Sequence, residues 1–256
     1  MKHEVRRPGE GRRQEDRKGD ADGTGRPVSA ARWAWEWLKS ILIAFVLFLV
    51  IRTFLVEAFR IPTGSMEKTL LVGDFLLVNK AVYGAQLPGT SARLPAFEEP
   101  ARGDVVVFTP PHEPDKNYVK RLIGMPGDTL EMRDKVLYIN GEAQVEPYVQ
   151  HSDTFGMDVF LQDMLWQRRY LAPGVNPEEY RPTRDNWGPI VVPEGHYFML
   201  GDNRDDSEDS RYWGYVDKSA IKGRPLFIYY SFDTNAMRPF PWITQIRWGR
   251  IGGLVH

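Results

Sequence analysis

An uninterrupted apolar run at residues 41–51 places the strongest constraint on how this chain of 256 residues can fold. A helix over 37–59 built around this run would be roughly 30 Å long, which is enough to cross a bilayer. Aromatic side chains at its start would lie at the membrane interface, namely Trp33, Trp35 and Trp37. We therefore predict one transmembrane helix.

Two other interpretations of this segment are a buried helix of a soluble core and a cleaved signal peptide. A core helix is rarely apolar on every face. Val56-Glu57-Ala58 fits a small-residue cleavage site loosely, but the polar segment before the run is long and Arg52 interrupts it. We expect the segment to be retained as an anchor.

The flanking charges predict an orientation for this anchor. Residues 1–36 form a segment dominated by charged residues and glycine, which predicts a disordered tail. Its arginines and lysines outweigh Arg60 and Lys68, so the tail should stay in the cytoplasm. Residues 60–256 would then lie on the extracytoplasmic face of the plasma membrane.

The outer domain carries short β-branched and aromatic runs bounded by Gly, Pro and Asp, a pattern typical of strands. Asn140-Gly141 within 135–145 predicts a β-hairpin, and 189–203 predicts a strand pair around a Pro-Glu-Gly turn. Strands and helices do not alternate, so we predict a mostly β domain with antiparallel sheets. The other predicted strands lie at 74–80, 104–110, 117–124 and 225–232.

One segment of the β domain, 158–171, has apolar residues at helical spacing. It predicts an amphipathic helix packed on the sheet. An alternative is a patch that rests on the membrane surface.

The composition excludes several classes of function. The net charge of −1 gives no reason to expect a nucleic-acid partner. The chain has no cysteine, which excludes disulfides, thiolate metal sites and cysteine nucleophiles. Its five histidines have no metal-ligand spacing, so we expect neither a metal nor another cofactor.

Ser65 follows the apolar segment directly and is a candidate nucleophile that needs a base to take its proton. A histidine triad is one option, although no histidine lies in a recognisable motif. Lys68 is another, because Ser65 and Lys68 spell S-x-x-K, but the companion KTG motif of penicillin-binding proteins is missing.

Lys120 is the third candidate base. Strand alternation over 117–124 places it on one face with Tyr118 and Leu122, where burial would lower its pKa toward neutrality. Arg121 faces the other way and cannot deprotonate. The alternative is that Lys120 extends its ammonium to the sheet edge and stays solvated.

The acidic segment 201–214 has several interpretations. It could be a solvated turn, and it fits a calcium loop poorly. Asp209 and Arg211 could form an ion pair, and Ser207 could present its hydroxyl to a neutral amine.

Taken together, these segments resemble the bacterial type I signal peptidases, membrane-bound serine–lysine endopeptidases that release exported proteins. The resemblance covers most of 38–256 and is weakest over 146–185, the family's variable insert. It rests, in chain order, on "IPTGSMEKTL", "GDFLLVNK", "RGDVVVF", "YVKRLIGMPGD", "VPEGHYFMLGDNRDDSEDSRYWGYV" and "RIGGLVH".

The resemblance implies that Ser65 is the nucleophile and Lys120 the base. The Ser65 backbone N–H and the Thr63 hydroxyl would bind the oxyanion. Family members more often have serine where Thr63 stands, and usually proline at Lys68, which argues against Lys68 as the base. The implied supporting residues are Ser207, which would orient the Lys120 amine, and Asp209 and Arg211, which would brace the site.

The resemblance also implies a shallow groove in which an extended preprotein places small side chains at −1 and −3 in two pockets. The expected partners are exported preproteins, the lipid bilayer and the nearby translocation channel. The residues expected by position to line the pockets are Phe59, Ile61, Met66, Leu70, Leu76, Tyr118 and Val119.

Two other hypotheses compete with this one. The first is a β-lactam-sensitive transpeptidase that uses Lys68, and the missing KTG argues against it. The second is a non-catalytic, membrane-tethered β module that binds export machinery or envelope components.

Overall fold

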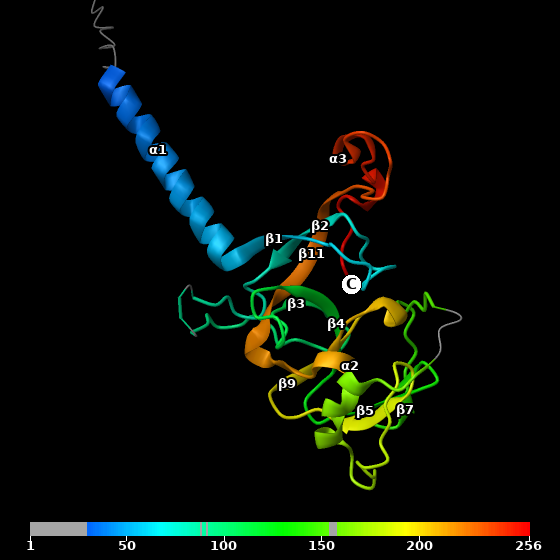
Figure 1. Cartoon of the computed structure of the whole chain (residues 1–256). Helices are drawn as coiled ribbons and strands as arrows, with labels where there is room; N and C mark the ends of the chain where they lie inside the picture. Colours follow the sequence, from blue (N-terminus) through cyan, green and yellow to red (C-terminus); the bar gives the residue numbers. More distant parts are fainter. Residues whose placement is uncertain (1–29, 88, 91, 154–157) are drawn as a thin grey trace, which may run out of the picture. The chain divides into compact units, whose positions relative to one another are not determined.

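The computed structural model describes residues 30–87, 89, 90, 92–153 and 158–256, in two units, Met1–Phe45 and Val46–His256 (Figure 1). Among these residues one helical stretch, Arg32–Leu55, has the length and composition of a membrane span, and none of it is buried. Apolar side chains such as Leu42 and Phe45 are more than half exposed, unlike those of a soluble core helix.

The apolar helix differs at both ends from the predicted helix over 37–59. Helix α1, Ala30–Val50, begins inside the segment expected to be tail, whose residues 1–29 lie outside the described residues. A π-helical turn, Ile51–Leu55, follows, and Val56–Arg60 is strand β1. The prediction was wrong here because β1 pairs along its whole length with β2, Asp74–Asn79, and such cross-strand pairing is not visible in local sequence.

The rest of the chain is mostly β, and every pair of neighbouring strands in its sheets is antiparallel, which confirms the predicted fold class. A seven-stranded sheet has the order β1-β2-β11-β3-β4-β9-β10, and a four-stranded sheet has the order β7-β6-β5-β8 (Figure 1). The remaining strands of the larger sheet are β3 (Val105–Phe108), β4 (Tyr118–Gly124), β9 (His196–Leu200), β10 (Val216–Asp217) and β11 (Ile221–Ser231).

The smaller sheet contains the predicted hairpin, β6 (Val136–Ile139) and β7 (Glu142–Ala143). Asn140 and Gly141 both have positive φ, 53° and 85°, as a tight hairpin turn requires, so this prediction is confirmed. The other strands of this sheet are β5 (Thr129–Arg133) and β8 (Trp187–Val191).

The predicted strand pair over 189–203 is only partly correct. Both strands form, but β8 pairs with β5 in the smaller sheet, whereas β9 pairs with β4 and β10 in the larger one. The Pro-Glu-Gly turn therefore connects two sheets and closes no hairpin.

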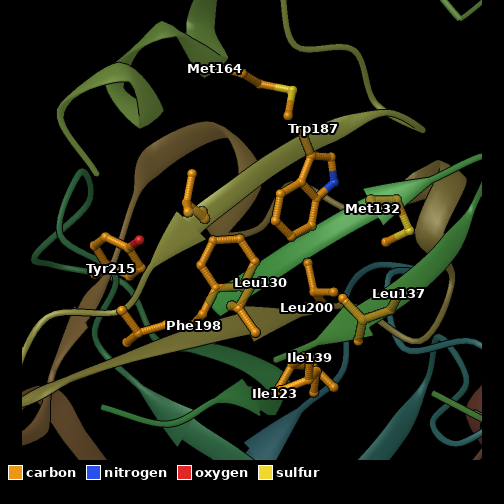
Figure 2. Packing of buried hydrophobic residues seen from close by; sticks show 12 residues of the cluster. Ile123, Leu130, Met132, Leu137, Ile139, Met164, Trp187, Phe198, Leu200 and Tyr215 are labelled. Atoms are coloured by element: carbon orange, nitrogen blue, oxygen red, sulfur yellow. The ribbon is translucent and has the colours of Figure 1, made fainter. Parts of the chain in front are cut away.

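A core cluster joins the two sheets, and Figure 2 shows Trp187 and Phe198 side by side within it. Their ring centroids are 5.3 Å apart. Met164, from the 3₁₀ helix Gln162–Tyr170, is fully buried in the same cluster. The segment 158–171 thus packs on the core as predicted, with 3₁₀ rather than α geometry. Two further clusters fill the larger sheet, one around Val106 and Phe108 and one around Leu76 and Val78.

Candidate active site

A groove of about 880 Å³ brings together Ser65, Lys120, Thr63 and Ser207, which the sequence separates by as many as 144 positions, 207 minus 63. Lys120 comes from β4, near the middle of the larger sheet, and Thr63 and Ser65 come from the turns after β1. Ser207 follows the short 3₁₀ helix Arg204–Asp206. The antiparallel strand order therefore assembles the groove from segments distant in sequence.

Ser65 is held through its backbone. Its carbonyl oxygen accepts a hydrogen bond from the Asn203 N–H at 3.1 Å, and Asn203 Nδ2 donates to the Gly64 carbonyl at 3.4 Å. Within the described residues, neither the Ser65 hydroxyl nor its backbone N–H makes a hydrogen bond. Both polar groups are thus available to a ligand in the groove, although Ser65 is only 8% exposed.

Lys120 is a buried amine on β4. It is 4% exposed, and burial lowers its pKa to about 8, with opposing contributions from Asp209, which raises the pKa, and Arg211, which lowers it. In the part of the chain that the structure describes, its ammonium makes no hydrogen bond or ion pair, to Ser65 or to any other group. Its nitrogen lies 5.9 Å from the centroid of the Tyr118 ring.

Arg121, the next residue on β4, points to the opposite face, as predicted. Its guanidinium donates to both carboxylate oxygens of Asp202, at 2.8 Å and 2.7 Å. Asp202 precedes Asn203, the residue that holds the Ser65 backbone. The ion pair on the far face of the strand thus supports the loop that positions Ser65.

Asp209 and Arg211 form the predicted ion pair, and both are buried. Arg211 Nε and Nη2 each donate to the Asp209 carboxylate at 2.8 Å, and Nη2 also donates to the Arg204 carbonyl at 2.7 Å. Asp209 Oδ2 accepts from the Gly201 N–H at 3.1 Å. The pair therefore fixes both ends of the loop that carries Ser207.

The Ser207 hydroxyl is buried and has no hydrogen-bond partner within the described residues. Burying a hydroxyl without a partner costs free energy, so such groups call for an explanation. Because Ser207 and Lys120 line the same groove, this hydroxyl can form a hydrogen bond with an amine or a ligand that approaches it.

The alternative bases lie elsewhere. Lys68 donates to the carbonyls of Pro147 and Val149 at 3.0 Å and 3.1 Å, and it is not among the residues that line the groove. No histidine is among the described residues of the lining. His112 lies nearby but stacks on Trp213, with ring centroids 5.5 Å apart.

Most of the expected pocket residues do line the groove, namely Phe59, Ile61, Met66, Tyr118 and Val119. Leu70 and Leu76 do not. Both are fully buried in the core cluster behind it, where they pack with Met66 and Ile61. Leu76 lies on the inward face of β2, and Leu70 lies in the turns before that strand, so both side chains pack into the core instead of the groove.

One side of the groove is acidic, which was not predicted from the sequence. Within the acidic segment 201–214 only Ser207, Asp209 and Arg211 were singled out, although the clustering of carboxylates there was a visible signal. Lys116, Asn117 and Tyr212 also line the groove, with Arg60 and Pro62 from the anchor side. The acidic members are Asp163, Asp205, Asp206 and Glu208.

Comparisons with known proteins show the family of this chain. Residues 34–230 match the family described as signal peptidase, peptidase S26, and the chain belongs to that family. It is therefore a signal peptidase, a protease that processes signal peptides.

Several curated relatives are similar over most of their length. Signal peptidase I of Pseudomonas aeruginosa is 40% identical over 234 residues, covering 86% of this chain and 79% of the relative. Signal peptidase I of Pseudomonas fluorescens is 39% identical and covers 82% and 78%. Signal peptidase I of Bacillus licheniformis is 38% identical and covers 78% and 90%.

Proposed function

We propose that this signal peptidase cleaves preproteins with Ser65 as nucleophile and Lys120 as general base. The observation that carries the proposal is the buried Lys120 amine, which faces the same groove as Ser65 and has a pKa of about 8. A lysine acts as a base near neutral pH only when its pKa is lowered by several units from its ordinary value.

In the proposed cycle the neutral Lys120 amine takes the Ser65 proton, and Oγ attacks the scissile carbonyl carbon. The tetrahedral intermediate collapses when the C–N bond breaks, and Lys120 returns the proton to the leaving amine. Lys120 then deprotonates a water that attacks the carbonyl carbon of the resulting ester, the C–O bond to Ser65 breaks, and Ser65 Oγ takes the proton back from Lys120. Ser65 and Lys120 are not hydrogen-bonded to each other among the described contacts, so the proposed proton transfer requires the two side chains to approach.

The oxyanion would accept hydrogen bonds from the Ser65 backbone N–H and the Thr63 hydroxyl. The unpaired state of that N–H supports this role. Each such donor typically lowers the barrier by about 2.7–4 kcal/mol. Ser207 would orient the Lys120 amine, and the Asp209–Arg211 pair would hold Ser207 in place.

The substrate would bind as an extended strand along the groove, where β1 is the edge strand of the larger sheet. Small residues at −1 and −3 would fit against the bulky side chains of Phe59, Ile61, Met66, Tyr118 and Val119. Larger side chains at −1 and −3 would clash with these groups, so the preference for small residues has a steric cause.

We place the enzyme in the plasma membrane, with α1 as a single anchor, the N-terminus in the cytoplasm and the groove on the extracytoplasmic face. The exposed apolar surface of Arg32–Leu55 supports the anchor. This orientation would hold the site near the translocation channel, where cleavage sites of exported preproteins emerge.

The test is cleavage of a purified preprotein in detergent by wild type, Ser65→Ala, Lys120→Ala and Lys68→Ala. We expect the first two variants to be inactive and Lys68→Ala to cleave like wild type. An inactive Lys68→Ala beside an active Lys120→Ala would replace the proposed base with Lys68. If all variants cleaved, Ser65 would not be the nucleophile.

A further inference from the structure

A second cavity, of about 910 Å³, lies wholly within the unit Val46–His256 and outside the groove of Ser65. The two share no described lining residue. One part of its wall is apolar, with Phe48, Leu49, Ile51, Val56, Leu77 and Leu87. The other part is strongly basic.

Four cations line the basic part, Arg52, Lys80, Arg93 and Lys222, against a single carboxylate, Glu57. The described lining therefore carries a net charge of 4 − 1 = +3. Glu57 lies 3.3 Å from the Lys80 ammonium, so that one carboxylate is already paired.

Among the described residues, no carboxylate is in hydrogen-bond contact with Arg93 or Lys222. The Arg93 guanidinium donates to backbone carbonyls, at 3.2 Å to Gly84 and 2.8 Å to Ile221, and to that of Ser219. Lys222 donates to the side-chain amide oxygen of Asn117 at 2.5 Å. Their hydrogen bonds thus go to neutral groups, and the carboxylates that act on them, Asp217 on Arg93 and Glu57 on Lys222, do so without a hydrogen bond.

Two of the other cations, Lys80 and Arg93, act on Lys222. Burial lowers the pKa of Lys222, Glu57 raises it, and the Lys80 and Arg93 charges lower it further. Burial likewise lowers the pKa of Arg93. An anion in the cavity would relieve both the desolvation and the mutual repulsion.

We propose that this cavity binds the phosphate-bearing headgroup of an anionic phospholipid, with an acyl chain along its apolar wall. Charge complementarity selects an anion, and the apolar wall selects one that carries hydrocarbon. Arg52 lies at the end of the apolar stretch Arg32–Leu55, where a headgroup would lie beside the proposed anchor. The inference rests on the membrane anchoring proposed above.

The test measures lipid retention by the full-length protein. The protein, purified in a neutral detergent, is titrated with phosphatidylglycerol or phosphatidylcholine, and bound lipids are counted by native mass spectrometry. We expect wild type to retain phosphatidylglycerol and not phosphatidylcholine. Each neutralised cation should lower the affinity about fivefold, so Lys80→Gln/Lys222→Gln should lose about 25-fold.

Two further variants separate lost binding from lost folding. Glu57→Gln removes the opposing charge and should bind phosphatidylglycerol about fivefold more tightly, a gain that misfolding cannot produce. Arg133→Gln/Lys218→Gln removes two positive charges, as Lys80→Gln/Lys222→Gln does, but from surfaces outside the cavity. It should leave lipid binding unchanged.

Equal retention of both lipids, or wild-type retention by Lys80→Gln/Lys222→Gln, would overturn the proposal. Displacement of the lipid by excess inorganic phosphate would make the cavity a small-anion site instead. Cleavage of a preprotein in the same detergent is measured in parallel. If wild type binds lipid but does not cleave, the proposed function fails and the lipid site stands.

Discussion

Gly201 separates the Ser207 hydroxyl from the Ser65 backbone: a Cβ at position 201 would lie 2.2 Å from Ser207 Oγ and 2.5 Å from the Ser65 carbonyl oxygen. Both contacts are far shorter than van der Waals distance. The nucleophile turn and the Ser207 loop can approach this closely only because residue 201 has no side chain.

Gly201→Ala is therefore expected to displace Ser65, Ser207 or both. A shift of about 1 Å at a reacting group can cost about 100-fold in rate, and we expect kcat to fall by that order. Gly249→Ala is the control, because a Cβ there meets nothing within 4 Å. A Gly201→Ala variant with wild-type kcat would contradict the close packing.

The buried lysine predicts the pH dependence of cleavage. Lys120 must be neutral to act, and its pKa is about 8, so kcat/KM should rise with pH through a midpoint near 8. The Glu208 carboxylate raises this pKa, so Glu208→Gln should move the midpoint to lower pH. Glu178→Gln, outside the groove, should not. A rate that stays flat down to pH 5 would exclude Lys120 as the base.

The same burial makes Lys120 a cost to stability. Above pH 10.5 the amine is neutral in both the folded and the unfolded chain. As pH falls through 10.5 to about 8, the unfolded chain gains a proton more readily, and the folded state loses up to about 3 kcal/mol. Lys120→Met should thus unfold at higher temperature than wild type in detergent at pH 7, and the difference should shrink toward pH 10.5. Lys68→Met, at an exposed position, loses two hydrogen bonds to backbone carbonyls and should not unfold at a higher temperature than wild type.

Ser207→Ala should show whether the Ser207 hydroxyl orients the Lys120 amine or contributes to the stability of the fold. Because the hydroxyl has no partner within the described residues, its removal leaves no protein group unpaired. We expect the melting temperature to stay within about 2 °C of wild type while kcat falls at least tenfold and the acid limb of the pH profile shifts. An unchanged kcat and profile would leave the hydroxyl without the proposed role.

Asp209→Asn should destabilise the domain strongly. It leaves the buried Arg211 guanidinium without its counter-charge, and breaking a buried pair typically costs about 3–5 kcal/mol. Glu131→Gln breaks the exposed pair with Arg133 and should leave the melting temperature close to that of wild type. Comparable melting temperatures for the two variants would show that the Asp209–Arg211 pair is not structural.

Local patterns in the sequence were informative wherever the determining contacts are local. Alternation along β4 separated Lys120 from Arg121, and Asn140-Gly141 predicted a hairpin, because both depend on neighbouring residues. The end of the apolar helix could not be predicted in this way, since β1 is set by its pairing with β2.

The grouping of the site was not predictable from spacing. Lys68 lies three residues from Ser65 and Lys120 lies 55 away, 120 minus 65, yet only Lys120 lines the groove. The strand order of the larger sheet, which no local pattern contains, produces this result. Only the resemblance to a family could favour Lys120 from sequence alone.

The connection between the apolar helix and Ser65 is short. Nine residues, 56–64, separate Leu55 from Ser65, and five of them are fixed in β1. With the helix in a bilayer, such a short connection would limit how far Ser65 lies from the membrane surface. If α1 anchors the enzyme as proposed, this connection would also limit the distance of the scissile bond from the lipid, and the enzyme would select cleavage sites by their depth as well as by their side chains.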